Sequence, residues 1–444
     1  MIRRVILGLL LLAAYPVLAQ VEPSASGGNP DTTNSGDMMT PPPVSGQSYP
    51  TEVGAEEQSN YLRGGMTFNT SYIDNLYAGS SAAVAETTYT ILPTILYDQV
   101  LPRQHISFTY RPGFTFYQPS SALNEVDQNL DAEYQYRLTP HMKVNARDDF
   151  QKSSTSYGVA DSIDGGAVSG SSQPITPGVI APFAERLTNS ASAQFSFQFS
   201  AVGMVGTSGN LMKLDYPNQA ESAGLFNSNE RGGGAFYNRR ISASQYMGAS
   251  YQYAWTLTSP GNTQSKTETN TLQGFYSIYL RHALSLSVSG GMQHYTVLQS
   301  SVPSSGAWGP SATASGGWQG ARFSVAGSYS RQVTSGGGLL GVFKSDSGNA
   351  NLRWKMARTW TAGLKGTYAN SESVTPLSFL SVQGGHSVSG QATAGHAINA
   401  HLNLNLEYDR VRESYSGIPA ISSNPNSDRV MISLAWQFEK PLGR

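Results

Sequence analysis

The chain has 444 residues, of which only 13% are charged, about half the share that is usual in soluble globular proteins. The net charge of −1 lacks the basic excess of nucleic-acid-binding proteins, and the absence of cysteine excludes disulfides, thiolate metal sites and a cysteine nucleophile. The low charge, 46 glycines, 24 tyrosines and lack of a long apolar run favour a closed β-structure in a membrane.

The first 19 residues have the pattern of a secretory signal peptide. Arg3 and Arg4 precede an apolar run over 5–12, and Ala19 ends a small-residue cleavage site. The run is too short to cross a bilayer as a helix, although an uncleaved anchor is the alternative interpretation. Residues 20–60 are rich in Ser, Gly, Pro and Thr, so we expect a disordered periplasmic leader before a barrel over 61–440.

From about residue 61, apolar and polar residues alternate in runs of roughly ten, the pattern of strands with two different faces. In the run 402–409, for example, four apolar residues alternate with Asn403, Asn405, Glu407 and Asp409. The pattern predicts about 18 strands, with 16 to 20 as the range: 64–73, 86–98, 105–117, 126–138, 141–152, 186–198, 202–212, 230–240, 244–257, 267–280, 283–298, 306–318, 321–333, 342–354, 358–370, 382–396, 400–411 and 428–438.

The connections between these strands decide the fold class. Every second connection is tight, as at Thr139-Pro140, and those between are longer, as over 153–185. This alternation predicts an all-β fold, a transmembrane antiparallel up-and-down β-barrel, with short turns and both termini in the periplasm of a Gram-negative bacterium. A barrel of this size is too wide for side chains to fill, so we expect the polar face to line water and the apolar face to contact outer-membrane lipid.

The last predicted strand resembles the closing strand of bacterial outer-membrane barrels, which ends in an aromatic residue that the insertion machinery recognises. The resemblance implies that machinery as a partner, although residues 439–444 extend beyond the aromatic end. The residues that carry it are Val430, Ile432, Leu434, Trp436 and Phe438.

Two further segments carry a wider resemblance. Residues 65–77 read as a strand that runs into the Asp74-Asn75 loop, and residues 106–116 form an aromatic-rich strand. In its alternation of apolar and polar residues, most of 61–438 resembles a family of outer-membrane β-barrel porins of Gram-negative bacteria. Some members of that family are encoded beside exopolysaccharide export machinery. The resemblance implies a barrel and, for function, the final passage of a polysaccharide across the outer membrane. Periplasmic export components would be its partners.

The sequence offers little for catalysis or metal binding. No Gly-x-Ser-x-Gly elbow accompanies a triad order, and His141, His282 and His401 lie at tight turns, where polar residues are expected. His294, on a long strand, is the residue that a barrel-wall hydrolase would use. The segment 161–166 resembles a calcium loop but lacks its closing glutamate. We therefore predict no enzyme activity, no cofactor and no metal.

Charged residues of both signs lie on the predicted polar faces, eight basic and five acidic, which we interpret as a nearly balanced lining. In a hydrated channel they would set the ion preference, whereas the plainer interpretation is that any aqueous lumen needs a polar lining. Glu133, Arg137, Lys143 and Arg147 could also pair across a tight turn and stiffen the wall. The predicted pore-lining residues are Arg111, Asp131, Glu133, Arg137, Lys143, Arg147, Asp149, Arg322, Arg353, Lys365, Glu407, Asp409 and Arg429.

The function that we predict is an outer-membrane pore for passive passage of polar solutes or, as the family resemblance alone implies, for polysaccharide export. One alternative is a structural or adhesive barrel with a closed lumen, and another is a barrel-wall hydrolase. The long loop 153–185 would either cap the outer mouth as a lid, the interpretation we favour, or fold into the lumen.

Overall fold

A computed structural model describes residues 60–76, 83–155, 183–218, 225–259, 265–280, 284–299, 302–334, 342–374, 384–416 and 426–442. The predicted signal peptide, nearly all of the predicted leader and most of the loop 153–185 lie outside these residues. Within the described part, no helix is long and apolar enough to cross a membrane.

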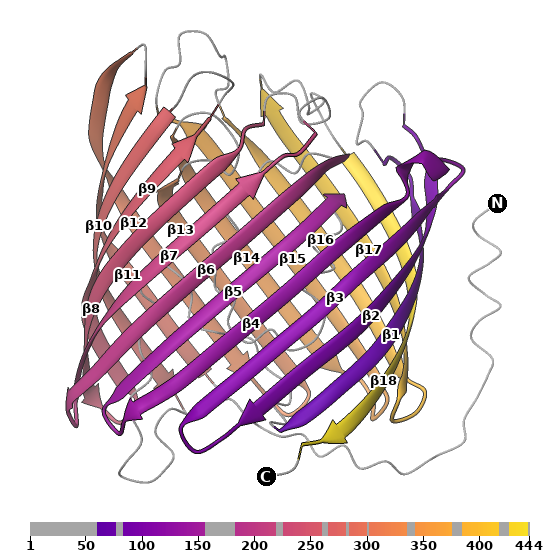
Figure 1. The fold of residues 1–444 in the computed structure, drawn as a ribbon, viewed down its shortest axis with the longest axis horizontal. Helices are drawn as coiled ribbons and strands as arrows, with labels where there is room; N and C mark the ends of the chain where they lie inside the picture. Colours follow the sequence, from indigo (N-terminus) through magenta and orange to yellow (C-terminus); the bar gives the residue numbers. More distant parts are fainter. Residues whose placement is uncertain are drawn as a thin grey trace.

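Eighteen strands follow one another along the described chain (Figure 1). Their only companion there is a short 3-10 helix, η2 (Ser121–Leu123). The strands are β1 (Tyr61–Ile73), β2 (Glu86–Val100), β3 (Gln104–Gln118), β4 (Glu125–Thr139), β5 (Met142–Thr155), β6 (Phe183–Ser200), β7 (Gly203–Asp215), β8 (Ser228–Ser242), β9 (Gln245–Thr258), β10 (Ser265–Leu280), β11 (Leu284–Gln299), β12 (Val302–Gln319), β13 (Phe323–Thr334), β14 (Phe343–Lys355), β15 (Trp360–Ser373), β16 (Gly384–Ala397), β17 (Leu402–Ser416) and β18 (Asn426–Pro441).

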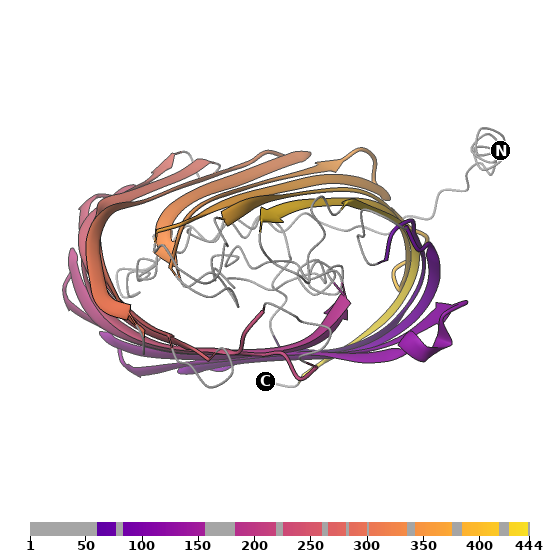
Figure 2. The ribbon, with the colours of Figure 1, turned by 90° about the horizontal axis from the view of Figure 1, so that it is seen from above.

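Each strand pairs antiparallel with its neighbours in sequence, and β1 pairs with both β2 and β18, so the sheet closes into a barrel. The strands are tilted, and the ring is elongated in cross-section (Figures 1 and 2). Closure leaves the sheet without a first and a last edge strand, which satisfies the backbone groups that an open sheet would expose. The prediction of an 18-stranded up-and-down barrel is confirmed.

Short and long connections alternate around the ring with one departure. Only residues 300 and 301 separate β11 from β12, whereas the sequence pattern predicts that strand only from 306, after a longer connection. Residues 302–305 lack an apolar alternation, but Ser305 pairs with Val297 and Val302 with Gln299 through the backbone, which needs no side-chain pattern. Likewise β18 continues past Phe438 to Pro441, opposite Tyr61.

The two faces of the barrel differ sharply. Large apolar side chains point outward into the surroundings, as with Leu272 (61% exposed) and Ile432 (54%). Between them, polar side chains point inward and are buried, as with Ser277 (1%). Near the short turns the outward rings stack in pairs, for example Phe323 on Trp354 with centroids 5.4 Å apart. An outward apolar band with an aromatic border is the surface that a barrel presents to lipid.

Candidate functional site: the inner face of the barrel

The register shows where the predicted pore-lining residues lie. Twelve of the thirteen alternate with outward apolar neighbours and therefore belong to the inner face. Arg322 instead lies in the short turn between β12 and β13. Their role in ion selection stays a prediction.

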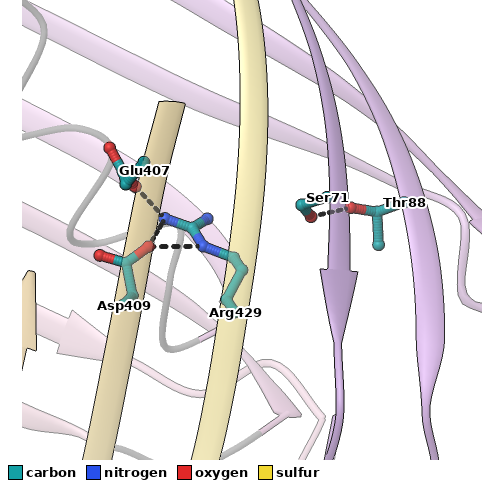
Figure 3. A network of polar contacts seen from close by, with 5 residues as sticks. All are labelled: Ser71, Thr88, Glu407, Asp409 and Arg429. Carbon is teal, nitrogen blue, oxygen red and sulfur yellow. Dashed lines mark hydrogen bonds and ion pairs between the residues drawn. The ribbon is translucent and has the colours of Figure 1, made fainter. Parts of the chain in front are cut away.

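Arg429 of β18 is the centre of a buried ion network (Figure 3). Its Nε lies 2.9 Å from Oδ2 of Asp409, and its Nη2 lies 2.6 Å from Oε1 of Glu407. Asp409 is directly opposite Arg429 on β17, and Glu407 is one inward position along the same strand. The Arg429 side chain is only 4% exposed, so this network braces the wall and contributes little free charge to a lumen.

Hydroxyl contacts continue the polar lining beyond this network. Ser71 of β1 and Thr88 of β2 lie 2.5 Å apart, oxygen to oxygen, on the next two strands around the ring (Figure 3). This contact links β1 to β2 by side chains, and the ion pair of Arg63 with Glu439, 2.9 Å apart, does the same across the closing pair β1 and β18.

A second ion pair joins β4 and β5. Nη2 of Arg147 lies 2.6 Å from Oδ2 of Asp131, although the register sets Arg147 opposite Glu133. The long guanidinium side chain reaches diagonally, and Glu133 accepts a hydrogen bond from Gln135 instead. Of the four residues that we expected to pair across this turn, Arg147 binds Asp131, which is outside the group. Arg137 lies opposite Lys143, which carries the same charge.

The opposite sector of the wall, β9 to β13, has an uncharged inner face. Within the described residues of these strands, the acidic, basic and histidine side chains are Lys266, Glu268, His294 and Arg331, and the register turns all four outward. The inner face is built of hydroxyl and amide side chains that bond across strands. The bonded pairs are Ser277–Ser287 (2.8 Å), Ser289–Thr313 (2.5 Å) and Gln273–Ser311 (2.7 Å).

Sequence reasoning missed this uncharged sector because it searched the polar faces for charged residues. The signal was present in the alternate Ser and Thr residues of 265–289. These residues share the inner face and carry hydroxyls where the strands β4, β5, β17 and β18 carry ions.

The ends of β13 and β14 around Val333 and Val342, here called the hairpin end, lie inside the barrel. Only the eight residues Ala312–Gln319 of β12 pair with β13, so β13 separates from the part of β12 that precedes Ala312. The side chain of Gln293 on β11 binds both the N–H and the carbonyl of Val333, at 2.8 and 2.9 Å. A Cβ at Gly309 would lie 3.7 Å from Cγ2 of Val333, so the hairpin end crosses the inner face of β12.

This hairpin end is packed as a small core. Val333, Val342, Tyr295 and Val297 form one buried apolar cluster, and Phe343 beside it is fully buried. The two hydrogen bonds from Gln293 hold this apolar cluster against the inner face of the wall, where it occupies part of the space inside the ring.

A hollow on the inner face lies on the other side of the ring. It has a volume of about 80 Å³ and is bounded by β1 to β5 and β18. Arg111 and Arg429 line it together with Thr90, Thr115 and Asn129. The charged sector therefore contains open space, whereas part of the uncharged sector is covered by the hairpin end.

The features considered for catalysis and metal binding have simpler structural roles. In the described part of the chain, no three His, Asp or Glu side chains are grouped so as to hold a metal. The ring of His294 lies on the outer face with its centroid 4.9 Å from that of Trp308. The candidate calcium segment 161–166 and the turn residue His282 lie outside the described residues.

No family model and no curated protein sequence matches the chain. Solved structures with a similar fold include the Pseudomonas aeruginosa protein OccK2, at 10% identity and a TM-score of 0.43, covering 86% of this chain and 98% of that one. The FrpB iron transporter of Neisseria meningitidis is 8% identical with a TM-score of 0.43, covering 86% and 83%. OccAB2 of Acinetobacter baumannii is 10% identical with a TM-score of 0.41, covering 87% and 100%.

Proposed function

We propose that the chain is an outer-membrane pore for the passive passage of polar solutes in a Gram-negative bacterium. The observation that carries this proposal is the contrast between the two faces of one closed ring: apolar outward and polar inward. A barrel of 16 to 18 strands leaves an aqueous channel, because its side chains are too short to meet across it. The outward apolar side chains would contact lipid, with the short turns on the periplasmic side.

The mechanism is diffusion through a hydrated lumen without covalent chemistry. Fixed ion networks such as Arg429 with Glu407 and Asp409 keep the wall rigid, and the other charged residues of the inner face set the electric field in the lumen. The hydroxyls and amides of β9 to β13 give the wall a polar lining that attracts neither sign of ion. The hairpin end held by Gln293 limits the size of what passes.

Export of a polysaccharide is the finer form of this proposal. It is supported by the family resemblance noted from the sequence and by the hydroxyl-rich sector, which suits a polyhydroxylated chain. Periplasmic export components would then be partners, and the outward side chains of β18, from Val430 to Phe438, would engage the insertion machinery. A structural or adhesive barrel with a closed lumen and a barrel-wall hydrolase are the competing functions.

Swelling of proteoliposomes tests the proposal. The full chain is reconstituted into liposomes loaded with stachyose, and the rate of swelling is followed by light scattering in isotonic arabinose, glucose, maltose and longer maltodextrins. A pore predicts fast swelling with small sugars and a decline at one size. Folded barrels, identified by heat-modifiable migration on gels, that give no swelling with arabinose would contradict the pore and favour a closed structural barrel.

A further inference from the structure

Basic residues are concentrated at one end of the barrel. Within four residues of a described short turn, or of the ends of β1 and β18 beside those turns, eleven Lys and Arg residues face only two acids, Asp98 and Glu439. We call this end the short-turn rim. Its basic residues are Arg63, Arg103, Arg137, Lys143, Arg239, Arg240, Arg322, Arg353, Lys355, Arg358 and Lys440.

The opposite end has no such excess. Within four residues of the other strand ends, the described residues include twelve acids and nine bases. The net charge of the whole chain is −1, so overall charge conceals a strong separation along the barrel axis. A separation of this kind creates a potential that attracts anions to one mouth.

Most of the rim charges that lie in paired strands are on the lumen side of the wall. The register turns Arg63, Arg137, Lys143, Arg240, Arg353 and Lys355 inward, whereas Arg239 and Lys440 point outward. Of the inward residues, Arg63 is held by Glu439. Basic residues placed to hold anionic lipid headgroups would be turned outward. The inward direction favours an anion inside the mouth over one in the membrane.

The pair Arg137 and Lys143 gives an independent observation. The two residues are directly opposite each other on β4 and β5, an arrangement in which like charges reduce the stability of a sheet. Glu133 on the same inner face attracts Lys143 and offsets part of this repulsion, and an anion bound between Arg137 and Lys143 would attract both side chains.

We infer that the lumen opening at the short-turn rim binds polyanionic solutes, molecules that carry several carboxylate, sulfate or phosphate groups. The inference rests on the proposed function, because it needs a lumen that solutes can enter. It goes beyond a balanced lining, which would give no preference for charge at either mouth.

Binding of fluorescent dextran sulfate to the detergent-solubilised full chain tests the inference. Anisotropy is measured at low salt for the wild type, for an inner variant and for an outer control. The inner variant combines Arg137→Gln, Lys143→Gln, Arg353→Gln and Lys355→Gln, and the outer control combines Arg239→Gln with Lys440→Gln. We expect uncharged dextran not to bind, and heat-modifiable migration verifies that each variant is folded.

The inference predicts that the inner variant loses about ten-fold or more in affinity and that the salt dependence becomes shallower, because fewer counterions are released. The outer control should change affinity less than about two-fold. Absence of wild-type binding would overturn the inference, and so would an outer control that loses as much as the inner variant, which would assign the rim to anionic lipid. Swelling by neutral sugars is recorded on the same proteins, so a pore that binds no polyanion leaves the proposed function intact.

Discussion

The two sectors of the barrel wall satisfy their buried polar groups by different means. Around β17, β18, β4 and β5, buried carboxylates are held by arginines, as Asp409 is by Arg429 and Asp131 by Arg147. Across β9 to β13, hydroxyls and amides bond to one another with no ion on the inner face of the described residues. Each buried ion depends on its partner, whereas a hydroxyl that loses its partner leaves a much smaller penalty. Substitutions should therefore affect stability strongly in the first sector and weakly in the second.

The largest effect is expected from Arg429→Ala. It leaves Glu407 and Asp409 buried without their cation, which costs about 3–5 kcal/mol in the free energy of unfolding. Urea titration followed by heat-modifiable migration measures the loss. Arg429→Lys, which keeps the charge but not the two-sided geometry, should recover part of it. If Arg429→Ala lowered the free energy of unfolding no more than a hydroxyl substitution in β10 does, the two sectors would not differ in how strongly stability depends on their polar contacts.

Gln293→Ala should have the next largest effect. It removes two hydrogen bonds and leaves the N–H and carbonyl of Val333 without this partner, a cost of about 2 kcal/mol. The released hairpin end should also widen the passage, so the size limit in swelling assays should rise. Because the chain has no cysteine, a single disulfide can be introduced without competing thiols. Gly309→Cys with Val333→Cys, added to Gln293→Ala, should hold the hairpin end in place and restore the size limit. An unchanged size limit in Gln293→Ala would mean that the hairpin end does not restrict the passage.

A third prediction concerns charge in the lumen. Thr271→Lys adds a cation to the uncharged sector and should move the reversal potential under a salt gradient toward anion selectivity. Lys365→Gln removes a cation from the inner face of β15 and should move it the other way. Leu272→Lys, which places the same charge on the outward neighbour of Thr271, is the matched control and should leave the potential unchanged. A shift from Leu272→Lys as large as that from Thr271→Lys would mean that the two faces are assigned wrongly.

The smallest effect is expected from Ser287→Ala. It breaks one hydroxyl contact, with Ser277, and should cost only about 0.5–1 kcal/mol. The same urea titration measures this loss, and the double substitution with Ser277→Ala should cost little more than the single one. A loss approaching that of Arg429→Ala would show that the uncharged sector is as tightly specified as the charged one.

Much of this architecture could be predicted from the sequence, because a strand with one lipid face and one water face alternates its residue types with a period of two. The alternation from Leu402 to Tyr408 alone predicts β17 and the direction of its two faces. The start of β12 could not be predicted, because residues 302–305 pair through the backbone and carry no such period. Contacts across strands, such as Gln293 with Val333, depend on how the sheet bends, which no local pattern encodes. The basic rim does not show in the composition, because the net charge sums over both ends of the barrel.

Single-channel conductance of the refolded full chain in a planar bilayer tests whether the lumen is open and hydrated. An open lumen gives steady ohmic current steps from folded barrels, and the step size increases in Gln293→Ala. Electrical silence from barrels that are folded by heat-modifiable migration would contradict it and would assign the chain to a closed structural role.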